Sequence, residues 1–576
     1  MNQDLAKILY EIGDFLESEE VPFKPYAYKS AAITVDSLEK NIADIYKKGG
    51  LKALEEIPGV GDSIAKKIEE YIKTGRIKYH RELQRKLPVK MEELIAVEGM
   101  GPKRAKFLFQ KLGVANLKDL EKAAKQDKIS TLFGFGPKAQ ANILQSIEFL
   151  KRAKGRFLLG EIFPTAQKTY NDLKNLKEVR RIDFAGSLRR RKETIGDIDF
   201  LAASNNPKKV MDFFVNLPGI VKVWGKGETK ASVRMKQGFD MDIRVVPEKS
   251  YGSALQYFTG SKEHNIILRK IAIEKGMKLS EYGLFKGDKM VAGKDEKEIY
   301  NILGLDWISP EIRENRGEIE AAKSGSLPKL IKLEDIRGDL HCHTDWNGGE
   351  NSIKEMAEKA IELNYDYIGI SDHTKYLKIE NGLDEKKLKK QKSEIVKINL
   401  ELQSQKPSFR ILHGAETNIL KDGSIDIKDD VLAELDYAIA GVHSHFKMEK
   451  QQMTERIIKA MKNPNIKIIA HPTGRILKKR DEYEVDFAKL LRAAKEFNTA
   501  LEINACPERL DLNDVNIRKA KDSGVKMAIN TDSHVKDRMR FMETGAAQAR
   551  RGWAEPADII NSWPLEKLLE YLRHRK

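Results

Sequence analysis

The sequence predicts a multidomain protein with an all-α N-terminal region, a central α+β region and a C-terminal α/β region. Its 576 residues are enough for about four domains at roughly 150 residues each. Residues 1–150 read as short helices joined by glycine-rich turns, and strand patterns begin near residue 156. After a stretch with Gly, Ser and Pro at 321–330, apolar runs alternate with charged helices, which is typical of parallel strands.

The composition narrows the class of partner. A net charge of +16 and a pI of about 9.3 favour a polyanionic partner such as nucleic acid, although a lysine-rich surface that only maintains solubility gives the same balance. Two cysteines without a C-x-x-C motif exclude a disulfide framework and fit a reducing compartment. The N-terminus lacks a signal-peptide pattern and no apolar run is long enough for a membrane span, so we expect a cytoplasmic protein.

Three glycine turns in the N-terminal region repeat one design: IPGVGDSIAKKI (57–68), VEGMGPKRAKFL (97–108) and LFGFGPKAQANI (132–143). A G-x-G turn exposes successive backbone N–H groups beside a helix N-terminus, which makes an anion site. Ordinary turns between paired helices, with glycine for positive φ, are the alternative. The repeats resemble helix-hairpin-helix motifs, which grip DNA phosphates without reading sequence. That resemblance implies DNA contacts at Gly59, Gly61, Lys66, Gly99, Gly101, Lys103, Gly134, Gly136 and Lys138.

The segment FAGSLRRRKETIGDIDFLAAS (184–204) carries the first candidate catalytic site. Asp197 and Asp199 are two residues apart in a predicted strand, so both face one side, and Asp242 in MDIRVV can come from a neighbouring strand. Three converging carboxylates can hold two Mg²⁺ ions, which would activate a 3′-hydroxyl and hold a triphosphate. An Asp-x-Asp pair by itself is more often a solvated strand edge. Here phosphate donors and positive charge are close by: Gly186, Ser187, Arg189 and Arg190.

The motifs GSLRRRKETIGDID, MDIRVV and YFTGSKEHN together resemble family X DNA polymerases of the beta type, over residues 1–315. The resemblance implies that Asp197, Asp199 and Asp242 are the metal ligands. Asp240 lies on the same face, but the family pattern falls on Asp242. Arg191 stands where the family has glycine, and an added phosphate contact is one interpretation. The implied nucleotide site is Gly186, Ser187, Arg190, Gly196, Tyr257, Phe258, Gly260, Asn265 and Arg269, with Tyr257 and Phe258 against the sugar.

The N-terminal region also resembles the lyase domain of polymerase beta. Lys67 falls on the position of the Schiff-base lysine, and Lys24 and Tyr28 match residues around that pocket. Ser63 stands where the family has a phosphate-binding lysine, and a Schiff base requires a lysine of lowered pKa. Two interpretations stay open: a deoxyribose phosphate lyase, or an exposed helix lysine at Lys67 that contacts phosphate.

Histidines and carboxylates follow the predicted C-terminal strands. His341 and His343 are two positions apart and so point the same way on a strand, whereas Cys342 between them should pack on the opposite face. Imidazole and carboxylate together suit Mn, Zn or Fe better than Mg. Scattered core histidines are the alternative, but the chain has only 11 histidines and six belong to this set. The set is His341, His343, His373, Glu416, His443, His471, Asp532 and His534.

This pattern resembles the PHP domain (polymerase and histidinol phosphatase) over residues 336–576. The resemblance implies a distorted seven-stranded β/α barrel, a three-metal phosphoesterase centre and, in bacterial polymerases, a 3′–5′ exonuclease and DNA end-processing site. The family pattern places an aspartate ligand after the H-x-H-T motif, and this chain lacks it, so eight of nine expected ligands remain. Asn347, Gly348 and Gly349 align there, flanked out of register by Asp345 and Glu350.

The predicted domains are a lyase-like helix-hairpin-helix domain (1–85), a second helix-hairpin-helix region (86–155), a palm (156–250), a thumb (251–316), a linker (317–335) and a PHP domain (336–576). We expect a monomeric repair polymerase, active in base excision repair on nucleoid DNA, with no membrane partner. It would fill gapped or primed DNA with dNTPs, using two Mg²⁺, and trim 3′ ends at a Mn, Zn or Fe site. The rivals are a nucleotidyltransferase acting on RNA or a small molecule, and a polymerase whose PHP domain is a silent scaffold.

Overall fold

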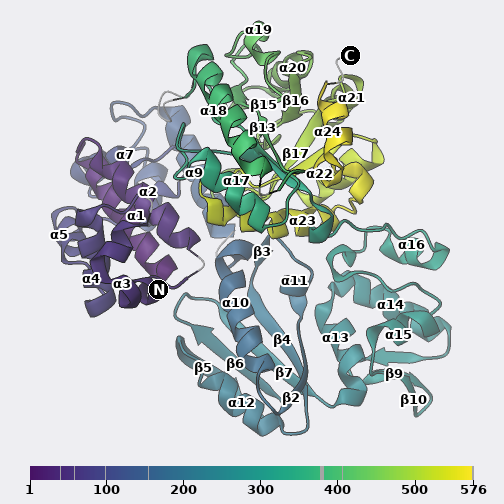
Figure 1. The fold of residues 1–576 in the computed structure, drawn as a ribbon. Coiled ribbons are helices and arrows are strands. Elements are labelled where there is room, and N and C mark those ends of the chain that lie inside the picture. The colour runs from purple at the N-terminus through teal and green to yellow at the C-terminus, as the bar shows by residue number, and fades with distance from the viewer. Residues whose placement is uncertain are drawn as a thin grey trace.

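Figure 1 shows the computed structural model of the chain, which describes residues 1–38, 40–57, 59–97, 99–152, 155–376, 382–404 and 406–573. The N-terminal helices form a body beside the C-terminal region, and the central sheet and its neighbouring subdomain extend away from that region (Figure 1). The expected boundary near residue 155 adjoins residues 153 and 154, which are outside the described residues. None of the helices in the described ranges combines the length and the apolar character that crossing a membrane would need.

The N-terminal region is all-α and has its own core. Leu5, Leu9 and Ile12 of the first helix are fully buried and start an apolar cluster that extends to Ile147. This continuous core explains why the short helices are stable together although each is short alone. The helices are α1 (Asn2–Ser18), α2 (Lys24–Ser37), α3 (Ile42–Glu55), α4 (Asp62–Thr74), α5 (Lys78–Lys86), α6 (Met91–Ile95), α7 (Pro102–Leu112), α8 (Leu117–Lys125) and α9 (Pro137–Arg152).

The three glycine turns have the same backbone conformation. The φ values are +77° at Gly59, +78° at Gly99 and +79° at Gly134. A residue with a Cβ would lose about 1–2 kcal/mol in this left-handed region, so glycine is required at the first position of each turn. The turns lead into α4, α7 and α9, as the repeat predicts.

The central sheet has the order β2-β4-β7-β6-β5, with β4 and β7 parallel and the other neighbours antiparallel. Met241, Ile243 and Val245 alternate along β7 and face the apolar core under two helices. The other face of the sheet is therefore free to carry polar groups. The elements are β1 (Phe157–Leu158), α10 (Leu159–Lys174), β2 (Val179–Phe184), α11 (Gly186–Arg189), β3 (Thr194–Ile195), β4 (Asp197–Ser204), α12 (Pro207–Val215), β5 (Ile220–Lys226), β6 (Lys230–Met235) and β7 (Asp240–Val246).

The next subdomain packs on the end of this sheet around a buried ion pair. Arg313 is fully buried, and its Nη1 lies 2.8 Å from Oε1 of Glu296. The segment 317–335, expected to be a linker, contains a helix whose Ile319 and Ala322 are buried. Its apolar residues bind it to this subdomain, so it is a packed connection. The elements are α13 (Tyr251–Thr259), α14 (Lys262–Glu274), β8 (Lys278–Ser280), β9 (Gly283–Lys286), β10 (Lys289–Ala292), α15 (Glu296–Ile302) and α16 (Glu318–Ser324).

The C-terminal region is an α/β barrel of parallel strands, as predicted. Three strands pair in the order β11-β12-β13 and five in the order β14-β15-β16-β17-β18. A bridge from Cys342 to Ser533 joins the first and last strands, and β13 and β14 are separated only by Gly414 and Ala415, so the barrel has seven strand passages. The strands are β11 (Gly338–Cys342), β12 (Tyr367–Ile370), β13 (Arg410–His413), β14 (Glu416–Asn418), β15 (Ala438–Gly441), β16 (Ile466–Ile469), β17 (Ala500–Asn504) and β18 (Met527–Asn530).

Helices surround the barrel strands and bury an extended apolar cluster. They follow the strands in sequence, which is the arrangement that parallel strands require for their crossover connections. The helices are α17 (Ile353–Glu362), α18 (Glu385–Gln403), α19 (Asp429–Leu432), α20 (Lys450–Met461), α21 (Phe487–Glu496), α22 (Asp514–Asp522), α23 (Met542–Arg551) and α24 (Leu565–Arg573).

One arginine at the end of α23 connects three parts of the chain. Arg551 is 5 % exposed and donates to the carbonyl of Arg190, 2.8 Å away, beside the central sheet. Its guanidinium also contacts Glu314 Oε1 at 3.2 Å and Asp514 Oδ2 at 2.5 Å. The barrel is thereby fixed to the central region by a buried, fully paired cation.

Replacing Arg551 with alanine should lower the free energy of unfolding by about 3–5 kcal/mol, because Glu314 and Asp514 would lose a buried partner. A urea unfolding midpoint checks this. Lys168→Ala, which removes an exposed pair with Asp172, should cost less than about 1 kcal/mol. Equal losses in the two variants would show that burial of the Arg551 cluster adds nothing.

Candidate metal centres

The central sheet brings three carboxylates together at one edge. In the parallel register of β4 and β7, Asp197 pairs with Asp240 and Asp199 pairs with Asp242. Burial, reinforced by Asp197 and Asp242, raises the pKa of Asp199 to about 7. Burial and Asp242 also raise the pKa of Asp197. Carboxylates that repel each other in this way are stabilised by a divalent cation, so the donor set fits Mg²⁺.

Asp240 and Asp242 share a face but differ in their partners. Arg234 contacts Asp240 through Nε at 2.5 Å and Nη2 at 2.8 Å, and the Trp224 indole donates to it at 2.8 Å. The Arg234 hydrogen bond holds the pKa of Asp240 below its ordinary value. Asp242 lies 3.2 Å from the Lys230 ammonium. Asp240 is therefore neutralised by the protein, and Asp242 is the carboxylate beside Asp199.

Gly186 makes room for the carboxylate of Asp199. A Cβ on Gly186 would stand 2.2 Å from Asp199 Oδ2, and its φ of +57° also favours glycine. Gly186 and Ser187 open the short helix α11, beside the carboxylates. Gly196 immediately precedes β4, with the Arg156 guanidinium 3.7 Å from its Cβ position.

The arginines after Ser187 are largely engaged by protein groups. Arg189 forms a two-point contact with Glu296, at 2.9 and 2.7 Å. Arg190 donates to Glu314 at 3.1 Å and to the carbonyl of Thr259. Both guanidinium groups thus hold the neighbouring subdomain against the sheet, a role that the sequence pattern did not indicate.

Arg191 occupies a left-handed position, with φ of +52°, which accounts for glycine in the family pattern. Its guanidinium lies 4.3 Å from the centre of the Phe163 ring, and Nη2 lies 3.1 Å from Glu543 of the barrel. The structure thus directs Arg191 to the interface with the barrel, where it is partnered by protein, and gives no support to the interpretation as a phosphate contact.

The other predicted nucleotide residues gather where α13 meets α14. The rings of Tyr257 and Phe258 are 5.1 Å apart, and Gly260, with φ of +72°, separates the two helices. The Asn265 amide donates to the carbonyl of Tyr257 at 2.7 Å, and Arg269 Nε donates to the carbonyl of Asn265 at 3.3 Å. Hydrogen bonds thus link Tyr257, Asn265 and Arg269.

Lys67 lies in a partly buried aromatic surrounding. Its Nζ is 5.8 Å from the Tyr28 ring centre and 5.4 Å from that of Tyr79, and it donates to Ser63 Oγ at 3.1 Å. Burial lowers the pKa of Lys67. Lys24 begins α2. The other predicted hairpin lysines lie near the starts of their helices. Lys66, in the second turn of α4, pairs with Asp62 at 2.7 Å. Lys103 pairs with Glu20 at 2.8 Å, and Lys138 is exposed at the start of α9.

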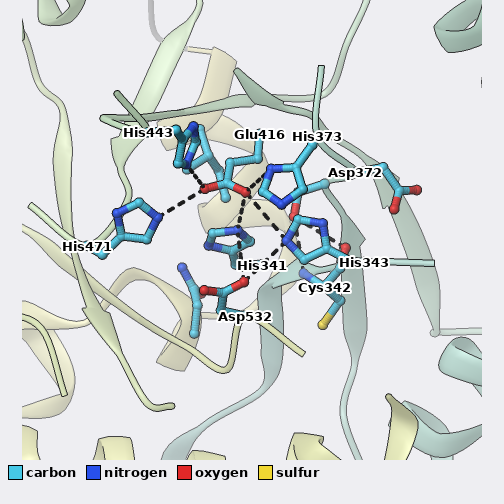
Figure 2. Close-up of polar contacts among 12 residues, drawn as sticks. His341, Cys342, His343, Asp372, His373, Glu416, His443, His471 and Asp532 are labelled. Carbon is cyan, nitrogen blue, oxygen red and sulfur yellow. Dashed lines mark hydrogen bonds and ion pairs between the residues drawn. The ribbon is translucent and has the colours of Figure 1, made fainter. Parts of the chain in front are cut away.

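The barrel gathers all eight predicted histidine and carboxylate residues at the ends of its strands. Glu416 lies at their centre, as Figure 2 shows. Its Oε1 is 3.0 Å from His443 and 3.1 Å from His471. Its Oε2 lies near three further histidines, at 3.2 Å from His341, 3.5 Å from His343 and 2.7 Å from His373.

Asp532 completes the other side of this cluster. Its Oδ1 lies 3.3 Å from His343 Nε2 and 3.7 Å from His341 Nε2, and His534 Nδ1 is 3.8 Å away. Three overlapping groups have ligand atoms close enough to share an ion: His343 with His373 and His534, His341 with His343 and Asp532, and His373 with Glu416 and His443.

The histidine cluster has unused donor atoms. Among the residues that the structure describes, buried ring nitrogens of His341, His343 and His471 are left without a hydrogen-bond partner. Leaving such atoms unpaired is costly, and coordination of a metal would satisfy them. Burial alone would raise the pKa of Glu416, but the neighbouring imidazoles, His373 first, outweigh it and hold that pKa well below its ordinary value. The residues present therefore fit a multinuclear transition-metal centre.

The segment that lacks the expected aspartate forms hydrogen bonds with the backbone of two predicted ligand residues. Asn347 Oδ1 accepts from the His373 N–H at 3.1 Å, and the Glu350 N–H donates to the His534 carbonyl at 2.9 Å. The side chain of Glu350 extends to the N-terminal region, where it accepts from Ser30 Oγ. It lies 3.1 Å from the Cβ position of Gly59. Glu350 is thus committed to a contact between domains.

Among the described residues, Asp345 belongs to none of the three groups whose ligand atoms lie close enough to share an ion. Burial first, and then Glu355, raise the pKa of Asp345, whose N–H donates to the Asn351 carbonyl. A Cβ on Gly349 would lie 2.7 Å from the Thr344 carbonyl.

Cys342, as expected, is fully buried in an apolar cluster.

The sequence motifs did not indicate three further residues near the barrel centre. Glu502 accepts from His341 Nδ1 at 2.7 Å, and Asn418 contacts His443 Nδ1 at 2.7 Å, so each fixes the orientation of a ligand ring. Arg509 Nε lies 3.8 Å from Asp532 Oδ2. Glu502 had a signal in the sequence, a carboxylate inside the apolar strand ALEIN, whereas Arg509 follows the strand in an irregular loop.

Sequence models of four domain families match the chain. A helix-hairpin-helix domain matches residues 1–77, and a SAM-like helix-hairpin-helix tandem matches residues 91–148. A DNA polymerase beta thumb matches residues 254–314, and a PHP domain matches residues 339–506.

Curated proteins match at full length and in part. The DNA polymerase/3′-5′ exonuclease PolX of Bacillus subtilis (strain 168) is 37 % identical over 576 residues, covering 99 % of both chains. A probable phosphatase of Thermoanaerobacter sp. (strain X514) is 31 % identical over 251 residues. One of Caldicellulosiruptor saccharolyticus is 29 % identical over 245 residues. Each phosphatase match covers 41 % of this chain and 95 % of the relative.

Gly348→Asp should raise the metal content of the barrel, because it returns a carboxylate to the turn after the His341-x-His343 strand. Gly348 has φ of +68°, a conformation that Asp and Asn adopt more readily than other L-residues. Gly348→Asn is therefore the matched control, with the same backbone cost and no charge. Metal analysis after equilibration with Mn²⁺ checks the prediction. Equal metal content in the two variants would show that this carboxylate is dispensable.

Proposed function

The chain belongs to the family X DNA polymerases that carry a C-terminal PHP domain, and we propose that it fills short gaps during DNA repair and trims 3′ ends before extension. The observation that carries the proposal is the presence of two separate sets of metal-binding side chains in one chain. Asp197, Asp199 and Asp242 form one set, and the eight-residue cluster around Glu416 forms the other. The full-length match to a DNA polymerase/3′-5′ exonuclease supports the pairing of these two activities.

At the polymerase site, Asp197, Asp199 and Asp242 would hold two Mg²⁺ ions. These ions supply activation of the primer 3′-hydroxyl and stabilisation of the leaving pyrophosphate. The raised pKa of Asp199 means that the negative charge of the three carboxylates is poorly compensated by protein groups, which favours cation binding. Ser187 and the backbone at the start of α11 would contact the dNTP phosphates, and Tyr257 and Phe258 would face its sugar.

At the PHP site, the eight residues would hold Mn, Zn or Fe ions, which supply a polarised phosphoryl group and an activated water. Glu502 and Asn418 would keep two ligand rings in orientation. Arg509 would add positive charge beside Asp532, where an anionic phosphodiester binds. The missing aspartate should leave one ion weakly held, so we expect slow trimming that depends on added Mn²⁺.

The helix-hairpin-helix turns would grip the DNA backbone, and the protein would act as a monomer. The surroundings of Lys67 favour a second activity, cleavage of a 5′-deoxyribose phosphate. Burial between Tyr28 and Tyr79 lowers the pKa of Lys67, as a Schiff-base lysine requires. Ser63 supplies no cation for the phosphate, so we expect weak lyase activity.

Two rivals have different experimental signatures. A silent PHP scaffold need not bind transition metals, yet the buried unpartnered ring nitrogens favour binding. A nucleotidyltransferase acting on RNA or a small molecule would share Gly186, Ser187 and the aspartates. It would not need three hairpin turns or the Tyr257–Phe258 pair. Incubation with gapped duplex and Mg²⁺ or Mn²⁺, with and without dNTPs, separates extension from trimming and tests the proposal as a whole.

Asp199→Ala and Asp242→Ala should each reduce dNTP incorporation at a gap by at least about 100-fold, since the reacting groups lose a metal ligand that positions them. Metal content at the PHP site should not change, because its ligands lie in another domain. Asp240→Asn is the control: it keeps the Trp224 and Arg234 neighbours and should retain incorporation. Substantial extension by either alanine variant would exclude the polymerase assignment.

DNA affinity should fall steeply with salt, because each phosphate contact releases counterions and contributes roughly −0.9 to the slope of log K against log salt on duplex DNA. Lys138→Gln should reduce that slope by about 0.9 if α9 grips a phosphate. Lys168→Gln, on the outside of α10, should leave it unchanged. Fluorescence anisotropy with a gapped duplex measures both, and a flat wild-type curve would contradict backbone gripping.

A further inference from the structure

A cleft of about 330 Å³ lies between the palm and the PHP domain. Arg156, Glu193 and Thr194 line the palm side. Arg475, Lys478 and Arg480 line the PHP side. The residues that line the cleft include none of the predicted metal ligands of the two centres.

The palm side of the cleft continues to the polymerase carboxylates. Thr194 belongs to β3, three residues before Asp197. Arg156 donates to Thr194 Oγ1 at 3.0 Å, and its guanidinium lies 3.7 Å from the Cβ position of Gly196. Burial and Asp242 raise the pKa of Asp197, and Arg156 opposes that rise. In Figure 1, β3 stands at the junction of palm and barrel.

The PHP side of the cleft continues to the histidine centre. Arg475 follows the ligand His471 by four residues, and its guanidinium donates to the carbonyl of Leu510. The neighbouring residue, Arg509, contacts the ligand Asp532. Phe446 lies in the loop after His443, and the Arg480 guanidinium stacks 3.9 Å from the centre of its ring. The cleft is therefore lined by segments that lead, on one side, to the polymerase carboxylates and, on the other, to the histidine centre.

The charges of the cleft suit an anionic ligand. Within the described parts of the chain, no carboxylate pairs with Arg156, Lys478 or the adjacent Lys479 within 4.0 Å. Of the acids that line the cleft, Glu193 is neutralised by a two-point contact with Arg475, at 3.3 and 2.7 Å. Glu482 accepts from Asn513 at 2.6 Å, and Asp481 is exposed to solvent. Arg475 is 7 % exposed, and the described residues offer its Nε no hydrogen-bond partner.

A second hollow, of about 280 Å³, shares Arg480 with the first and is also lined by Lys479. Its opposite wall is the second hairpin turn, from Gly99 to Gly101. An aromatic surface is also present, because the Lys478 ammonium lies 5.6 Å from the ring centre of Phe157. Cations that follow a groove together with aromatic rings are the features with which proteins bind single-stranded nucleic acid.

We propose that this cleft binds the single-stranded 3′ segment of a primer as it passes from the polymerase carboxylates to the PHP centre. Lys478 and Lys479 contact its phosphates, and the second hairpin turn holds the strand at the outer end. The proposal rests on the two activities proposed above. The cleft is the path that a frayed 3′ end takes from the polymerase site to the PHP site.

The test compares Lys478→Gln/Lys479→Gln with Lys390→Gln/Lys397→Gln, an equal loss of charge on the exposed face of α18. Each full-length protein is bound to a primer–template with a mismatched 3′ nucleotide. Metal and excess heparin are then added together, so that only bound primer is excised. Hydrolysis of thymidine 5′-(p-nitrophenyl phosphate), which needs no cleft, reports the PHP centre itself.

We expect the cleft variant to excise the mismatch about tenfold more slowly. The slope of log K against log salt for binding of this primer should be smaller by roughly 1.4, because two single-strand phosphate contacts are lost. Hydrolysis of the small ester and extension of a matched primer should equal those of the control variant. Wild-type excision and slope in the cleft variant would overturn the proposal, and so would an equal loss on the small ester. A wild-type protein inactive on both nuclease substrates would instead overturn the proposed PHP activity.

Discussion

The buried carboxylate of Glu416 is the constraint on which the PHP domain depends. An ion in such a place costs several kcal/mol unless it is closely compensated. Five histidines from successive parts of the barrel lie within 3.5 Å of its two oxygens. These contacts exist only when the strands are in register and the barrel is closed, so folding of the domain and formation of its centre are one event.

The palm also brings carboxylates close together, but protein groups compensate their charge only in part. Asp240 accepts hydrogen bonds from Arg234 and Trp224. Burial, together with Asp197 and Asp242, raises the pKa of Asp199 to about 7 against the opposing charges of Lys230 and Arg190. The protein thus neutralises Asp240, whereas the charges of Asp197, Asp199 and Asp242 repel one another. Gly186 is required by the same geometry, since any side chain there would meet Asp199.

Residues that act within one element or one register could be predicted from the sequence. The hairpin glycines follow from a local turn, the aspartates from strand alternation, and the histidines from the rule that parallel strands present polar groups at their ends. Contacts between distant domains could not be predicted in this way. Arg191 extends to Glu543, Glu350 extends to Ser30, and α16 packs within a segment that composition describes as a linker. Each depends on how separate folding units dock, which no short pattern encodes.

The loop from Asn347 to Glu350 joins two events that are usually considered apart. Its backbone and amide hold His373 and His534, while its one long side chain lies against Ser30 beside the first hairpin turn. Thermodynamic linkage makes any coupling through such a loop reciprocal. If docking of the N-terminal domain changes the affinity for metal by some factor, then metal must change the docking equilibrium by the same factor. A chelator that removes the metal would then also shift the docking equilibrium of the N-terminal domain.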